Sequence, residues 1–178
     1  MRMKTRMNTS WSLALALAPL LLAVAACRKP QVCRDVVVDY SDRPVGELVT
    51  GFLVEQSFAP NHDRLSAVAV NMATYAGRAR DCRVAFRLRA EGSPNVIDDK
   101  VVPCSAIADN SWVRFDFGPL AGSKGEKFVL TIESPNGQPG NAATLWMASV
   151  PGIYPEGALS VNGVPTPGAL RFMTFHEQ

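Results

Sequence analysis

Histidine is scarce in this sequence of 178 residues. His62 lies in a predicted loop, His176 lies near the C-terminus, and neither has a partner at the ligand spacing of a zinc site. We therefore expect both histidines to be solvated, and we expect no metal ion and no other cofactor. A Gly-x-Ser-x-Gly motif is also missing, which excludes the nucleophile turn of the α/β-hydrolases.

Paired carboxylates that could support catalysis are also missing. Asp98 and Asp99 are neighbours in a predicted strand, so their side chains would point to opposite faces and could not flank one glycosidic bond. Asp63, Asp98 and Asp109 lack the spacing of a calcium-binding loop. We predict that the chain is not an enzyme. The alternative is a glycan-active enzyme whose site residues are dispersed along the sequence.

Acidic residues are absent ahead of Cys27, whereas Arg2, Lys4 and Arg6 all precede it. Of the 18 basic and 16 acidic residues, 15 basic and all 16 acidic ones therefore follow, which gives that part of the chain a formal charge of −1. This balance does not favour nucleic acid as a partner.

The three cations are followed by an apolar run over residues 11–26, WSLALALAPLLLAVAA. Pro19 interrupts this run, which is shorter than the roughly 20 residues that span a bilayer core. The layout is that of a secretory signal, so we predict a signal peptide over residues 1–26. A retained transmembrane anchor is the alternative.

The segment Val24-Ala25-Ala26-Cys27 resembles the lipobox of bacterial lipoproteins. The resemblance implies that Cys27 becomes a lipidated N-terminus, whose acyl chains, such as palmitate, attach the protein to a membrane. Arg28 stands where an Asp would favour retention in the inner membrane, so we expect placement in the cell envelope on the outer membrane, facing the periplasm. Plain secretory cleavage, with Cys27 as a free thiol, is the alternative.

Three further cysteines, Cys33, Cys82 and Cys104, would lie in an oxidising compartment. Residues 83–90 and 96–104 predict two strands joined by a turn over residues 91–95, and a hairpin centred near residue 93 places Cys82 opposite Cys104. We predict a disulfide between them, with two reduced, buried thiols as the alternative. Cys33 would remain free.

Short apolar segments recur after this point about every dozen residues, separated by Gly, Pro, Asn and Asp, and no amphipathic stretch is long enough for a proper helix. Apolar and polar residues alternate over 112–118 and 127–133, whereas 65–75 is apolar on both faces, as in a central strand. The other predicted strands are 35–40, 52–58, 83–90, 96–104, 144–150, 158–161 and 169–175. The pattern predicts an all-β fold, a single antiparallel β-sandwich of jelly-roll type over residues 47–178, after a lipidated tether at 27–46.

Six segments of the mature chain form a recognisable set: Glu55-Gln-Ser-Phe58, the run from Leu65 to Tyr75, Phe115-Asp-Phe-Gly-Pro-Leu120, Ile132-Glu-Ser-Pro135, Gly140-Asn-Ala-Ala-Thr-Leu-Trp146 and Tyr154-Pro-Glu-Gly157. On these segments the chain, from about Val45 to Phe175, resembles a β-sandwich accessory module found in bacterial envelope proteins and membrane-bound glycosyltransferases. The resemblance implies a jelly-roll-like fold and a role in recognising or organising polysaccharide. It implies no catalytic residue. The lipobox, the cysteines and the basic stretch Gly77-Arg78-Ala79-Arg80 depart from the module.

One candidate ligand surface follows from strand alternation. Arg83, Arg87 and Arg89 alternate with apolar residues, and Trp112 and Arg114 could lie nearby on another strand. Guanidinium groups grip carboxylates bidentately and an aromatic ring stacks on a sugar, so this combination could bind acidic sugars. The alternative is a solvated sheet face whose arginines are balanced by local acids. We expect a non-catalytic module that binds envelope glycan or a protein partner, or a structural subunit of an envelope assembly that binds no small ligand.

Overall fold

The computed structural model describes residues 30–178, so the predicted signal peptide at 1–26 and the predicted lipidation site at Cys27 lie outside the described residues. In the described part, the chain forms strands and one short 3-10 helix, η1 (Cys104–Ala106). The strands are β1 (Val32–Val38), β2 (Arg43–Pro44), β3 (Leu53–Phe58), β4 (Leu65–Ala73), β5 (Arg83–Ala90), β6 (Val96–Pro103), β7 (Ser111–Leu120), β8 (Phe128–Glu133), β9 (Thr144–Ala148), β10 (Leu159–Val161), β11 (Val164–Thr166), β12 (Ala169–Leu170) and β13 (Phe172–Glu177). The predicted all-β fold is confirmed.

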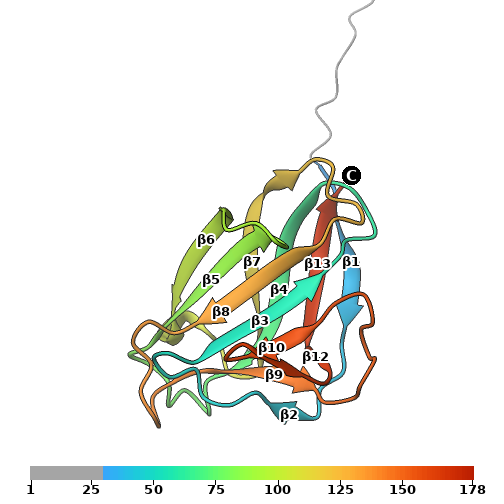
Figure 1. The fold of residues 1–178 in the computed structure, drawn as a ribbon. Helices are drawn as coiled ribbons and strands as arrows, with labels where there is room; N and C mark the ends of the chain where they lie inside the picture. The colour runs from blue at the N-terminus through green and yellow to red at the C-terminus, as the bar shows by residue number, and fades with distance from the viewer. Residues whose placement is uncertain (1–29) are drawn as a thin grey trace, which may run out of the picture.

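The strands form two antiparallel sheets packed face to face (Figure 1). The first sheet has the order β1-β13-β4, with β7 on the other side of β4. The second sheet has the order β11-β10-β3-β8-β5-β6. The four-strand sets β1-β13-β4-β7 and β3-β8-β5-β6 interleave along the chain as in an eight-stranded jelly roll, the predicted topology. The short strands β9 to β12 are inserted between β8 and β13, and β9 and β12 extend the first sheet together with β2.

The core lies between the sheets and follows the predicted alternation. Val84, Phe86 and Leu88 of β5 point inward and are buried, as is Phe115 of β7. Every residue of β4 is buried, including the small Ala67 and Ala69 on its outer side. β4 is therefore the central strand that the apolar segment at 65–75 predicts, because β13 and β7 flank it on its two edges.

The boundary predicted between tether and sandwich is too late in the chain. β1 pairs with β13 from Val32 to Val38, and β2 pairs with β9, so residues 32–44 belong to the first sheet. The tether predicted over 27–46 therefore ends before Val32. The sequence predicts a strand at 35–40 but not its start at Val32, because a β-bulge between Arg34 and Val37 breaks the polar and apolar alternation of β1.

Candidate functional site

The outer face of the second sheet carries a row of polar side chains across four strands. Ser160 of β10, Glu55 of β3, Thr131 of β8 and Arg87 of β5 are successive cross-strand partners. Glu55 lies at the centre of the row: its Oε1 accepts hydrogen bonds from Thr131 and from Arg89, and its Oε2 accepts one from Ser160. Side chains that share one face of a sheet in this way can contact a single ligand together.

A shallow pocket of about 330 Å³ lies over this row. Its polar wall consists of Glu55, Arg89, Ser57 and Ser160, together with Glu91 from the turn after β5. Its apolar lining comes from Val129, Ala158, Leu159 and Pro165. Arg89 and Glu55 form an ion pair at 3.1 Å across the pocket wall, with side chains 30% and 26% exposed. Both charges are therefore held in place and still reachable by a ligand.

Beside the pocket, a second arginine of β5 is also paired with an acidic side chain. Arg87 forms an ion pair of 2.6 Å with Glu133 on the neighbouring strand β8. Arg83 is exposed at the start of β5. The second sheet thus holds Arg83, Arg87 and Arg89 on one face, as the alternation predicts, and places acids beside two of them.

The predicted surface that combined these arginines with Trp112 and Arg114 is not formed. β5 belongs to the second sheet and β7 to the first, so the two groups of side chains lie on opposite outer faces of the sandwich. The error arises because sequence alternation gives the face of a strand within its own sheet and says nothing about which sheet the strand joins.

Trp112 and Arg114 instead cover the outer side of β4. The guanidinium of Arg114 lies 4.1 Å from the centre of the Phe175 ring and its Nε donates to Asp116 at 2.6 Å. The guanidinium of Arg171 lies 5.2 Å from the centre of the Trp112 ring. Small residues on β4, such as Ala69 opposite Arg114, leave room for these side chains to lie flat. This face is filled by the protein's own arginine and aromatic side chains.

The predicted disulfide between Cys82 and Cys104 is confirmed. Arg83 pairs with Pro103 at the ends of β5 and β6, so the two cysteines lie opposite each other just beyond the strands, with their Cα atoms 5.3 Å apart. The hairpin centre near residue 93 fixes this register, although a bulge at Arg89 shifts the pairing close to the turn. Cys33 has no disulfide partner among residues 30–178.

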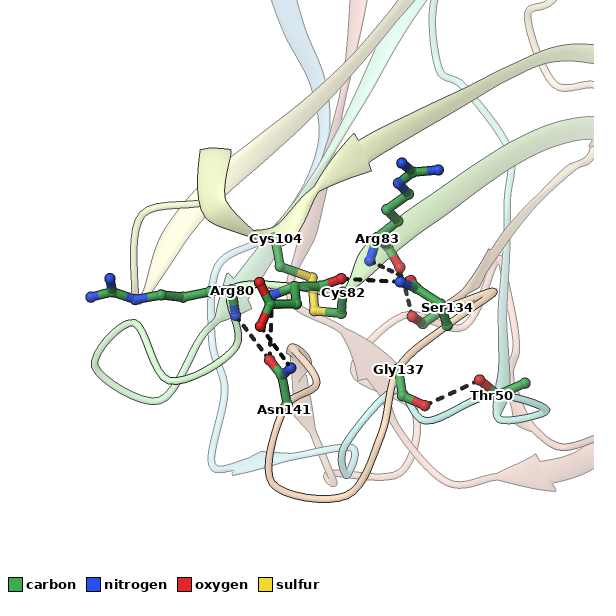
Figure 2. Close-up of a disulfide and its surroundings, with 10 residues drawn as sticks. Thr50, Arg80, Cys82, Arg83, Cys104, Ser134, Gly137 and Asn141 are labelled. Atoms are coloured by element: carbon green, nitrogen blue, oxygen red, sulfur yellow. Dashed lines mark hydrogen bonds between the residues drawn. A yellow bond between two sulfur atoms is a disulfide. The ribbon is translucent and has the colours of Figure 1, made fainter.

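The loop between β8 and β9 supports the disulfide from one side (Figure 2). The hydroxyl of Ser134 donates to the carbonyl oxygen of Arg83 at 2.6 Å, and Oδ1 of Asn141 accepts from the amide of Arg80 at 3.0 Å. Thr50 donates to the carbonyl oxygen of Gly137 and fixes the far side of the same loop. The segment on each side of Cys82 is thus held by hydrogen bonds to this loop as well as by the covalent bond.

The two histidines are brought together, contrary to the expectation from their spacing. The His62 and His176 rings stack with centroids 4.4 Å apart, and Nδ1 of His62 lies 2.8 Å from Oδ1 of Asp35. His176 is only 5% exposed, so it is not a solvated side chain as predicted. The spacing argument considered only local neighbours, whereas β1, the loop before β4 and β13 meet at one end of the sandwich.

The sequence contains partial signals for Glu55 and Ser57, two pocket residues that are not among the predicted ligand-binding residues. Glu55 and Ser57 alternate with buried Val54 and Gln56 in a segment correctly predicted as a strand, so their outward direction could be inferred. Their approach to Arg89 could not, because it depends on the position of β8 between β3 and β5.

Comparison of the chain with protein-family models and with curated proteins gives no match. The resemblance to an envelope accessory module therefore stays a prediction, compatible with the observed sandwich. Within residues 30–178, no helix has the length and apolar character needed to cross a membrane.

Proposed function

We propose that this chain is a lipid-anchored protein of the bacterial cell envelope whose jelly roll binds envelope glycan, without catalysis, in the pocket on the outer face of the second sheet. The observation that carries the proposal is the combination, in one open pocket, of the Glu55–Arg89 ion pair with the side chains of Ser57 and Ser160 and an apolar floor. The predicted lipobox at Cys27 supports the location.

Each part of the pocket matches a part of a sugar. The hydroxyls of Ser57 and Ser160 can exchange hydrogen bonds with sugar hydroxyls. The guanidinium of Arg89 can grip the carboxylate of an acidic sugar in a bidentate manner. Ala158 and Pro165, both exposed, offer an apolar surface to the C–H face of the ring. An acidic polysaccharide is therefore the expected ligand class.

Binding is favoured over hydrolysis by the partners of Glu55. Its two carboxylate oxygens already accept hydrogen bonds from Arg89, Thr131 and Ser160. A general acid or a nucleophile must offer an oxygen to the scissile bond, whereas a carboxylate bonded in this way orients its neighbours. Glu91 also lines the pocket, which leaves a glycan-active enzyme with two carboxylates as the alternative to exclude by experiment.

The test is a binding screen of acidic and neutral polysaccharides on the chain from Arg28 onward, which contains every strand of the sandwich. Arg89→Ala is run beside Arg114→Ala, a matched control with a similarly exposed and ion-paired arginine on the opposite face. We expect saturable binding to an acidic glycan that Arg89→Ala weakens at least tenfold and Arg114→Ala leaves unchanged. No binding to any glycan, or equal losses in both variants, would contradict the proposal.

The same incubations test the enzymatic alternative. Release of shorter oligosaccharides by the unmodified chain, abolished by Glu55→Gln or Glu91→Gln, would show that the pocket is catalytic. Intact glycan after prolonged incubation with bound protein is the result that the proposal predicts.

A second candidate function, binding of a protein partner, is favoured by the edge of the second sheet. β6 forms one edge of this sheet, and Val96, Ile97 and Val101 on it are 50%, 40% and 52% exposed. An exposed edge with apolar side chains can accept a strand from another protein. This candidate predicts that a partner co-purifying from cell envelopes is lost with Val101→Lys and retained with Arg89→Ala.

A further inference from the structure

Three distant parts of the chain meet at the end of the sandwich where the C-terminus lies (Figure 1). Asp35 belongs to β1, His62 to the loop between β3 and β4, and His176 to β13. Each offers one ligand atom, and these three atoms all lie within 4.8 Å of one another. A carboxylate and two imidazoles are common donors for zinc and related divalent transition ions.

The contacts of Asp35 hold its carboxylate in place. Its side chain is 1% exposed, and its Oδ2 accepts hydrogen bonds from the backbone amides of Asn61 and His62, at 2.9 and 3.4 Å. Its Oδ1 lies 2.8 Å from Nδ1 of His62. A carboxylate fixed by backbone donors beside an imidazole is a prepared ligand for a metal ion.

His176 supplies a second, independent observation. It is 5% exposed, and among residues 30–178 its Nδ1 has no hydrogen-bond partner. A buried ring nitrogen without a partner loses its hydration without compensation, which costs free energy. The second imidazole stacked against it, at an interplanar angle of 14°, donates no hydrogen bond to it that could offset this cost.

We propose that Asp35, His62 and His176 bind a divalent transition-metal ion of the zinc class. The His62 side chain is 60% exposed and can turn about its side-chain torsions. This rotation would bring its ring nitrogen to the usual distance from a bound zinc ion, about 2.0–2.1 Å. Solvent completes the coordination on the exposed side of His62. This site is separate from the glycan pocket, whose lining residues include none of the three.

A metal ion bound there would link β1 and β13, the first and last strands of the described chain, to the loop between β3 and β4. The backbone amide of Gln178 already donates to the carbonyl oxygen of Gln31, and Val32 pairs with Glu177. An ion that binds only the folded sandwich raises its stability by mass action. The site thus stabilises the sandwich close to β1, the strand that follows the predicted lipid tether.

The test is equilibrium dialysis of the full chain in detergent against Zn²⁺, with bound zinc quantified and thermal unfolding recorded. All proteins carry Cys33→Ser, because Cys33 is the cross-strand partner of His176 and its thiol could bind zinc itself. We expect one zinc per chain and a higher midpoint of unfolding in Zn²⁺, and neither effect with Mg²⁺ or Ca²⁺.

The variants locate the site. His62→Ala removes an exposed side chain and His176→Gln a buried one, and we expect each to weaken zinc binding at least tenfold and to remove the thermal shift. Glu177→Gln, a neighbouring carboxylate outside the cluster, is the matched control and should change neither. Because the chain has only two histidines, the NMR signals of both imidazoles should shift with zinc. Absence of stoichiometric zinc binding, or binding retained in His62→Ala, would overturn the proposal.

Discussion

The two sheets of the sandwich use arginine in different ways. On the first sheet, Arg114 and Arg171 lie over the rings of Phe175 and Trp112 and cover the small residues of β4. On the second sheet, Arg87 and Arg89 pair with Glu133 and Glu55 across strands, and Arg89 forms part of a pocket wall. The same residue type therefore completes the packing of one face and leaves the other open to a ligand.

The sheets also differ in how they are fixed. The β5–β6 hairpin at the edge of the second sheet is closed by the disulfide between Cys82 and Cys104. The ends of β4 in the first sheet are fixed by aspartates: Asp109 accepts from the amides of Thr74 and Ala76, and Asp63 from that of Ser123. The stability of the second sheet should therefore fall when the disulfide is reduced, and the stability of the first sheet should fall in acid.

Removal of the disulfide should lower the free energy of unfolding more than any other change considered. Cys82→Ala combined with Cys104→Ala removes a constraint on a loop with a sequence separation of 22 residues, and the free energy of unfolding should fall by about 3 kcal/mol on the chain-entropy estimate. Urea unfolding measures this fall. Hydrogen exchange should show the loss of protection concentrated in β5 and β6. A uniform loss over both sheets would show that the disulfide does not act on one sheet selectively.

A smaller effect is expected for the aromatic cover of the first sheet. Phe175→Ala removes a half-buried ring and its contact with Arg114, so it should cost about 2 kcal/mol. Arg87→Ala on the second sheet breaks a surface ion pair and should cost about 0.5 kcal/mol or less. Thermal or urea unfolding compares the two variants. Equal costs would remove the distinction between a structural and an open face.

The smallest effect is the acid response of the first sheet. The backbone amides of Thr74 and Ala76 hydrogen-bond the charged form of Asp109 and hold the pKa of its carboxyl below the usual value. Because the pKa is lower in the folded state, the stabilisation is present above the unfolded pKa, near 3.8, and is lost as pH falls below it.

Because Asp109 is exposed and solvent screens its carboxylate, Asp109→Asn should cost only about 0.3 kcal/mol at neutral pH. The difference from the unmodified chain should shrink as pH falls from about 5 to 3. Urea unfolding across this pH range is the measurement, and Asp99→Asn, at an exposed position on β6, is the control. A difference that stays constant with pH would contradict the assignment.

The sequence predicts the strands well and their assembly only in part. Alternation identifies β5, β7 and β8, and the apolar segment at 65–75 identifies β4, because one side-chain period determines both face and burial. The Cys82–Cys104 pairing is predictable because both residues belong to one hairpin, whose centre fixes the register.

Contacts between distant strands could not be predicted in this way. Strand alternation suggests that Trp112 lies near Arg87, but β7 and β5 belong to different sheets. The spacing of His62 and His176 predicts no partner for either ring, but the two rings stack. In each case the outcome depends on the order of strands in the sheets, which local pattern does not encode.

Binding of glycan to the open face of the second sheet can be observed by backbone amide NMR of the chain titrated with an acidic polysaccharide. We expect the shifting signals to belong to β3, β5, β8 and β10 around Glu55 and Arg89, while those of β1, β4, β7 and β13 stay in place. Shifts centred on Trp112 and Arg114 in the first sheet, or no shifts with any glycan, would contradict it.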